Sequence, residues 1–163
     1  MSLQNRNSMK PVTILLAEDS PEDVELLQEA FEHHQFPADL RPVRDGVEAM
    51  AYLRGEGPYA DAPRADLLLL DLNMPRMDGR QVLAAVKNDP QLQTLPIVVL
   101  TTSSAPDDVV HSYTHRANAF LTKPVDFDEF LELIRCLGEF WIDSVCLPSR
   151  AGLPPSDPTR MCP

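Results

Sequence analysis

Short apolar runs that recur along the chain limit the folds open to it. The three strongest are VTILLA at 12–17, DLLLL at 66–70 and PIVVL at 96–100. Each is too short for a helix and would be apolar on both faces, which is typical of the central strands of a parallel sheet. Two weaker runs, DLRPV at 39–43 and AFLT at 119–122, predict two further strands. Because Pro42 has no N–H to donate to a neighbouring strand, we expect residues 39–43 at a sheet edge.

Helical patterns fill the intervals between these runs. The segment SPED offers Ser20 as an N-cap and Pro21 as the first helical residue. The segment DFDE repeats the capping pattern with Asp126 and Glu129. Strands that alternate with helices predict βαβ units with right-handed crossovers. The fold class is therefore α/β, with a doubly wound parallel sheet covered by helices on both faces.

Length and composition favour one compact domain with tails. The chain has 163 residues, of which 44% are hydrophobic and 24% charged. We expect the domain at residues 10–145 and disordered tails at 1–9 and 146–163. The stretch LPSRAGLPPSDPTRMCP, which ends the sequence, has five prolines and no periodicity, as disordered segments do.

Charge and hydropathy disfavour several classes of protein. A formal net charge of -11 gives nucleic-acid phosphates no general reason to bind. No apolar stretch approaches the roughly 20 residues of a membrane span. The first ten residues lack the apolar centre of a signal peptide. Without a membrane span or a signal peptide, we expect a cytoplasmic protein. The three cysteines form no CxxC motif and leave one unpaired in any bridging scheme, so we expect reduced thiols.

Acidic and polar side chains follow the ends of the predicted strands. These are Glu18, Asp19, Asp71, Thr101 and Lys123. In open α/β sheets, ligands bind beyond the carboxyl ends of the strands, so we expect these side chains to converge. Converging carboxylates repel one another and persist together when a cation joins them. Hard oxygen ligands without Cys or His favour Mg²⁺, which keeps waters that a phosphate can replace. The pattern predicts a magnesium site that handles phosphate.

Four segments, AEDS, LLLLDLNMPRMDG, VVLTTS and FLTKP, resemble the receiver domain of two-component response regulators over about residues 11–142. Asp71, Thr101 and Lys123 are 30 and then 22 residues apart, close to the usual spacing in that family. The resemblance implies a flavodoxin-like fold with five strands in the order 2-1-3-4-5. With Phe140 and Trp141 late in the last helix, the chain is similar to the single-domain regulators that serve bacterial phytochrome kinases.

The resemblance also implies a role for each site residue. Asp71 is the phosphoacceptor, which takes a phosphoryl group from a phosphohistidine of a sensor histidine kinase. Asp19 and Asp71 ligate Mg²⁺ directly, Glu18 reaches it through water, and the backbone carbonyl of Asn73 is a further ligand. Lys123 pairs with Asp71 before transfer and with the phosphoryl oxygens afterwards.

Two switch residues and one backbone feature follow from the same resemblance. Thr101 donates its hydroxyl to a phosphoryl oxygen and moves toward it. Phe120 then swings into the space that Thr101 leaves, although a tyrosine is also frequent at this position. The bond between Lys123 and Pro124 is expected to be cis. Glu18 is a second departure from the commoner pattern, which has Asp as the first acid.

A different class of function uses the same nucleophile. Phosphohydrolases of the haloacid-dehalogenase type also attack with an Asp in an α/β sheet, and they place a second Asp two residues later as general acid. This chain has Asn73 at that position, which cannot supply the proton. A phosphorylated signalling protein, acting by protein contact or as a phosphate sink, is therefore favoured over an enzyme.

The last predicted helix carries more apolar residues than one stripe can bury. The segment DFDEFLELIRCLGEFWI contains nine large apolar residues in seventeen. Some of them must face outward, where exposed aromatic residues mark interaction surfaces. We therefore expect a homodimer formed through the face of the final helix and strand, with Phe140 and Trp141 near the contact.

Overall fold

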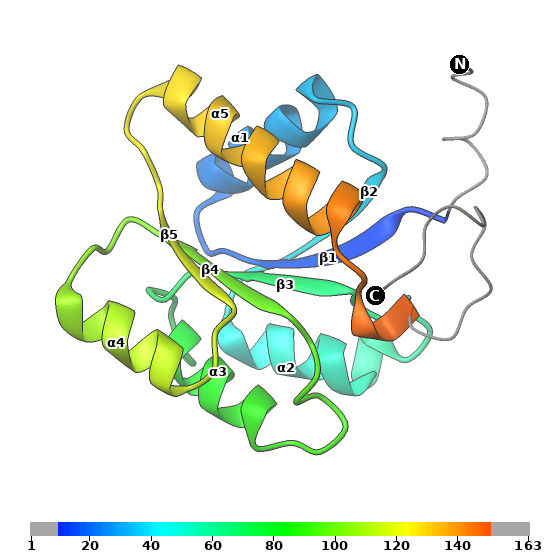
Figure 1. The fold of residues 1–163 in the computed structure, drawn as a ribbon. Helices are drawn as coiled ribbons and strands as arrows, with labels where there is room; N and C mark the ends of the chain where they lie inside the picture. Colours follow the sequence, from blue (N-terminus) through cyan, green and yellow to red (C-terminus); the bar gives the residue numbers. More distant parts are fainter. Residues whose placement is uncertain (1–9, 151–163) are drawn as a thin grey trace.

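The computed structural model describes residues 10–150. Its centre is a five-stranded parallel sheet in the order β2-β1-β3-β4-β5, which confirms the expected fold class and strand order (Figure 1). The strands are β1 Val12–Ala17, β2 Ala38–Val43, β3 Leu67–Leu70, β4 Ile97–Thr101 and β5 Ala119–Thr122. All five match the apolar runs of the sequence to within one residue at each end.

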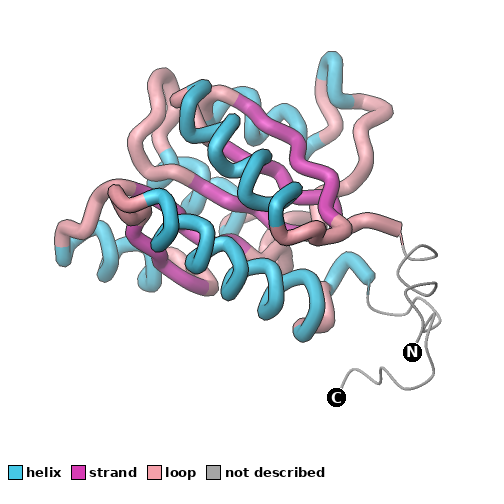
Figure 2. The backbone as a smooth tube through the Cα atoms, turned by 90° about the horizontal axis from the view of Figure 1, so that it is seen from above, coloured by secondary structure: helices cyan, strands magenta, loops and turns pink. Residues whose placement is uncertain are grey.

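Five α-helices connect and cover the strands. They are α1 Pro21–His33, α2 Gly46–Arg54, α3 Gly79–Lys87, α4 Pro106–Thr114 and α5 Phe127–Gly138. Helices α1 and α5 lie on one face of the sheet, and α2, α3 and α4 lie on the other (Figure 1). The view from above shows the helices lying over the strands (Figure 2). The sheet is therefore the middle of three layers.

The position of β3 between two layers of helices explains why its four residues are all leucine. Leu67 and Leu69 pack with α1 and α5, whereas Leu68 and Leu70 pack with α2 and α3. All four side chains are fully buried. Successive residues of a strand point to opposite faces, so a strand in the middle of three layers must be apolar at every position.

The N-caps of α1 and α5 and the position of β2 agree with the sequence predictions. The Ser20 hydroxyl accepts from the Asp23 N–H at 3.3 Å at the start of α1, and the Asp126 carboxylate accepts from the Glu129 N–H at 3.0 Å at the start of α5. Pro42 lies in β2, which is an edge strand. Both capping predictions and the edge prediction are confirmed.

The C-terminal part of the described chain differs from the prediction. The sequence predicts a disordered tail from residue 146 onward, but Leu147 is only 4% exposed and packs in the core layer of α1 and α5. A 3₁₀ turn follows at Pro148–Arg150, and the Ser149 hydroxyl donates to the buried carboxylate of Asp66. One apolar anchor and one hydroxyl thus hold a segment whose composition is that of a tail. Residues 1–9 and 151–163 lie outside the described part, so the tail prediction there stays a prediction.

The cysteines also differ in part from expectation. Cys136 is a free, exposed cysteine, whereas Cys146 is disulfide-bonded. The expectation of reduced thiols is therefore wrong at Cys146, and Cys162 lies outside the described residues. Within residues 10–150, no helix is long and apolar enough to cross a membrane.

Candidate functional site

Three carboxylates meet at the carboxyl ends of β1 and β3. Glu18 and Asp19 follow β1, and Asp71 follows β3, in the register that pairs Ala17 with Leu70. One oxygen of each carboxylate lies within 4.8 Å of the others. Glu18 is 3% exposed and Asp71 is 7% exposed, while Asp19 faces solvent. The expected convergence of these acids is confirmed, and it places two carboxyl groups, those of Glu18 and Asp71, in a poorly solvated site.

Lys123 supplies the compensating positive charge. It follows β5, and its ammonium forms ion pairs with Glu18, with Asp23 at 2.9 Å and with Asp71 at 3.3 Å. Its backbone N–H donates to the Thr101 carbonyl at 2.8 Å, which fixes the end of β5 beside the end of β4. One lysine therefore balances acids from three different segments of the chain.

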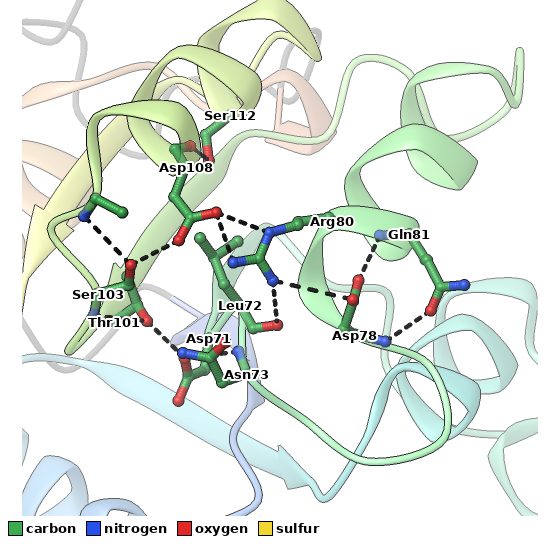
Figure 3. Close-up of polar contacts among 11 residues, drawn as sticks. Asp71, Leu72, Asn73, Asp78, Arg80, Gln81, Thr101, Ser103, Asp108 and Ser112 are labelled. Atoms are coloured by element: carbon green, nitrogen blue, oxygen red, sulfur yellow. Dashed lines mark hydrogen bonds and ion pairs between the residues drawn. The ribbon is translucent and has the colours of Figure 1, made fainter.

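Asp71 is also held by hydrogen bonds (Figure 3). The Thr101 hydroxyl donates to Asp71 Oδ1 at 2.8 Å, and the Asn73 N–H donates to the same oxygen at 3.2 Å. Thr101 is fully buried. The carboxylate is thus fixed in orientation by donors from β4 and from its own loop.

The pKa shifts follow from burial and from the charges around each group. Burial raises the pKa of Glu18 to about 7, against the opposing effect of Lys123. Burial also acts to raise the pKa of Asp71, but the nearby Lys123 charge and the hydrogen bonds to the carboxylate outweigh it and lower that pKa. For Lys123, burial acts to lower the pKa, and the acids around it raise the pKa above its usual value. Asp71 is therefore ionised and Lys123 is charged at neutral pH.

The structure thus brings together Glu18, Asp19, Asp71, Thr101 and Lys123, as the sequence predicts. The other predicted residues lie at different distances from the cluster. Asn73 adjoins it through its N–H. Phe120 is a half-buried residue of β5 that packs against the core layer of α2 and α3. The remaining pair, Phe140 and Trp141, lies in a π-helical turn, Glu139–Ser144, that continues α5.

One expectation about the backbone is wrong. Between residues 10 and 150 no peptide bond is cis, so the bond between Lys123 and Pro124 is trans. The Lys123 ammonium reaches the acids with the backbone in this form. The resemblance to the family was the only ground for the cis expectation.

Sequence reasoning missed three residues around the site. Asp23 lies in the first turn of α1, and its carboxylate holds Lys123. Arg80 and Asp108 form an ion pair beside the Asp71 loop. The position of Asp23, four residues after Asp19, was an available signal for the first. Nothing in the motifs points to the other two.

The donor set fits a divalent metal of the magnesium type. The oxygens of Glu18, Asp19 and Asp71 are hard ligands, and one oxygen of each lies within 4.8 Å of the others, close to the roughly 4.2 Å across an octahedral Mg²⁺ coordination sphere. The cluster consists of carboxylates alone, so it lacks the sulfur and imidazole ligands that favour zinc.

Comparison with known proteins gives one consistent result. The response regulator receiver domain profile matches residues 14–135. Response regulator Rcp1 of Synechocystis sp. is 43% identical over 142 residues, which is 87% of this chain and 97% of that protein.

Two solved structures extend the similarity to the fold. The phosphorylated cyanobacterial phytochrome response regulator RcpA is 46% identical, with a TM-score of 0.81 over 85% of this chain and 99% of that one. The Mn²⁺-bound form of Rcp1 is 43% identical, with a TM-score of 0.80 over 85% and 99%. Together with the strand order and the acidic site, these matches show that the chain belongs to the family of response regulator receiver domains.

Proposed function

We propose that this protein is a single-domain response regulator that accepts a phosphoryl group on Asp71 from a sensor histidine kinase in a Mg²⁺-dependent reaction. The observation that carries the proposal is the setting of Asp71. Its carboxylate is buried, accepts from the Thr101 hydroxyl at 2.8 Å and pairs with Lys123 at 3.3 Å, beside Glu18 and Asp19.

The reaction is an in-line displacement at phosphorus. A carboxylate oxygen of Asp71 attacks the phosphorus of the phosphohistidine, and an O–P bond forms as the P–N bond breaks. The imidazole nitrogen keeps the electron pair of the broken bond and takes a proton from solvent. The lowered pKa of Asp71 keeps the nucleophile ionised.

The neighbouring donors stabilise the charge that arrives with the phosphoryl group. The Lys123 ammonium, which contacts Asp71 before transfer, pairs with phosphoryl oxygens afterwards. Thr101 transfers its hydrogen bond from Asp71 Oδ1 to a phosphoryl oxygen. Each of these donors comes from a strand end that is fixed by the sheet.

Glu18, Asp19 and Asp71 would hold Mg²⁺, with the Asn73 carbonyl as a further ligand. The bound metal supplies positive charge that offsets the phosphoryl oxygens during transfer. Glu18 and Asp71 both contact Lys123, so the lysine and the metal share the task of balancing the acids.

The proposed partner is a bacterial phytochrome with kinase activity, in the cytoplasm. Support comes from the relatives, since the solved structure of RcpA is that of a cyanobacterial phytochrome response regulator. The competing phosphohydrolase function is disfavoured at Asn73, where an amide replaces the general acid. We propose that the chain catalyses only its own phosphorylation and dephosphorylation.

Labelling with acetyl phosphate and Mg²⁺ tests the assignment of Asp71. The wild-type protein should gain one phosphoryl group by intact mass, and Asp71→Asn should gain none. Asp107→Asn, a change at an exposed acid of α4, is the matched control and should label as the wild type does. Labelling of Asp71→Asn at the wild-type rate would refute the assignment, and continuous turnover of phosphate esters would favour the phosphohydrolase.

We also propose a homodimer through the face of α5 and β5. Phe140 is 55% exposed and Phe127, at the start of α5, is 48% exposed. Trp141 is half-buried and packs edge-on against Phe140, with ring centroids 5.3 Å apart. Such exposed aromatic groups support a protein contact.

Sedimentation at tens of micromolar, with and without a phosphoryl mimic, tests the dimer. Phe140→Ser should shift the protein toward monomer, whereas Val47→Ser, at a residue of α2 that is 45% exposed, should not. A wild-type protein that sediments as a monomer under both conditions would contradict the proposal.

A further inference from the structure

A closed chain of polar contacts joins the loop after β3 to the loop after β4 (Figure 3). On the β4 side, the Thr101 hydroxyl donates to Asp71, and the Ser103 N–H donates to the Thr101 hydroxyl oxygen at 3.4 Å. The Ser103 hydroxyl then donates to Asp108 Oδ2 at 2.6 Å. These contacts run from the Asp71 carboxylate to the first turn of α4.

Arg80 closes the chain on the β3 side. Its Nε and Nη2 donate to Asp108 Oδ1 at 2.9 and 2.6 Å. Its Nη1 donates to the Leu72 carbonyl at 3.5 Å, one residue after Asp71. Both loops that frame the carboxylate are therefore tied to one carboxylate of α4.

The ion pair between Arg80 and Asp108 is less exposed to solvent, and has more hydrogen bonds, than an ordinary surface pair. The side chains of Arg80 and Asp108 are 29% and 17% exposed, and two nitrogens of one guanidinium meet the same carboxylate. The Ser103 hydroxyl and Arg80 lower the pKa of Asp108. The Ser112 hydroxyl of the next helical turn donates to the Asp108 carbonyl at 2.7 Å, which further fixes this end of α4.

We propose that Arg80 and Asp108 are positioning residues of the phosphoacceptor site, which together with Ser103 form a latch that holds Thr101 in its unphosphorylated position. The inference rests on the proposed role of Asp71. It adds that phosphorylation must break the hydrogen bond from Ser103 to Asp108, a carboxylate that the ion pair with Arg80 holds in place.

The geometry gives the physical reason. When the Thr101 hydroxyl moves from Asp71 Oδ1 to a phosphoryl oxygen, the Ser103 backbone that contacts it must move as well. Ser103 then leaves Asp108, whose carboxylate stays with Arg80 and the β3 loop. Contacts made only in the unphosphorylated state reduce the fraction of molecules ready for phosphorylation, so they weaken the apparent affinity for a phosphoryl group.

Binding of beryllofluoride, a phosphoryl mimic, at saturating Mg²⁺ tests the latch by calorimetry. Arg80→Gln and Asp108→Asn should each lower the Kd for beryllofluoride by about fivefold or more, which is the smaller end of usual coupling between sites. The double variant should bind no tighter than the tighter single variant, because both changes open the same latch. Ser103→Ala removes only one hydroxyl and should also lower the Kd for beryllofluoride. Because this change is so small, it tests the latch even if one of the other variants misfolds.

Two controls separate the latch from a general effect on the site. Arg41→Gln removes an arginine that pairs with Asp39 on the exposed edge strand β2, and it should leave the Kd unchanged. The affinity for Mg²⁺ alone should match the wild type in every latch variant, because the latch side chains do not contact Glu18 or Asp19.

The outcomes distinguish the two proposals. If the wild-type protein binds no beryllofluoride and takes no phosphoryl group, the proposed function fails. If the wild type binds but the latch variants bind equally or more weakly, the latch is wrong, since loss of mere structural support weakens binding. Tighter binding by the three single variants, with Arg41→Gln unchanged, supports it.

Discussion

Gly79 lies where α3 approaches the backbone of the phosphoacceptor loop most closely. A Cβ atom at this position would lie 2.8 Å from the Leu72 Cα and 3.0 Å from the Asp71 carbonyl carbon, and closer still to the Asp71 carbonyl oxygen. These neighbours are backbone atoms at the end of a central strand, so no side-chain rotation can make room. The Gly79→Ala variant must therefore displace either α3 or the loop that carries Asp71.

The size of the effect follows from that displacement. Ordinary van der Waals contact begins near 3.4 Å, so several backbone atoms must move together. Overpacking typically lowers the free energy of unfolding by about 1–3 kcal/mol. Because the neighbours of Gly79 are rigid backbone atoms, we expect a loss of about 3 kcal/mol. For a domain of this size that corresponds to a fall in Tm of roughly 6–12 °C. A shift of ~1 Å at a reacting group can also cost about 100-fold in rate.

Thermal unfolding and the rate of labelling by acetyl phosphate measure the two effects. Gly57→Ala is the matched control, because a Cβ there meets nothing within 4 Å and only the positive φ of 56° opposes it. That strain should cost about 1 kcal/mol and leave the labelling rate unchanged. If Gly79→Ala is no less stable than Gly57→Ala and labels at the wild-type rate, the steric reasoning is wrong.

Three further predictions address the acids, the lysine and the C-terminal segment. Asp19→Ala should weaken Mg²⁺ binding by tenfold or more, about 1.4 kcal/mol, and unchanged binding by calorimetry would contradict its role as a ligand. Lys123→Ala removes the cation that Glu18 and Asp71 share, so it should lower the free energy of unfolding in urea by about 3 kcal/mol without Mg²⁺. Mg²⁺ should restore part of that loss, and an equal loss with and without the metal would count against the site. Leu147→Ala should cost about 2–4 kcal/mol in the same assay, and a cost near zero would mean that the segment does not contribute to the core.

The strands could be predicted because burial on two faces leaves a direct trace in the sequence. Leu67 to Leu70 must be apolar wherever the layers of helices lie, so the run is visible without any knowledge of the partners. Pro42 could be placed at an edge for an equally local reason. The strand order was not available from such patterns and came from the resemblance to the family.

The contacts that the sequence did not predict depend on distant partners. Arg80 and Asp108 are 28 residues apart, and either one alone reads as a solvated charge on a helix. Leu147 is a single apolar residue in a segment rich in proline. The composition of the segment predicts disorder, although this one side chain anchors it in the core. Periodicity detects features that repeat along the chain. Arg80, Asp108 and Leu147 are single side chains, and their partners become neighbours only when the chain is folded.

The buried Asp66 fixes the C-terminal turn of the described residues at the end of the sheet where β3 begins. Its Oδ2 accepts from the Thr13 N–H at 2.8 Å and its other oxygen from the Ser149 hydroxyl, so the start of β1 and the C-terminal turn share one anchor. Asp66 precedes β3 and Asp71 follows it, and at the usual rise per residue they are separated by roughly 16 Å along the strand. A fluorophore carried at residue 148, which is exposed, would therefore lie at the end of the sheet opposite Asp71 and leave the approach of a kinase to the acidic site open.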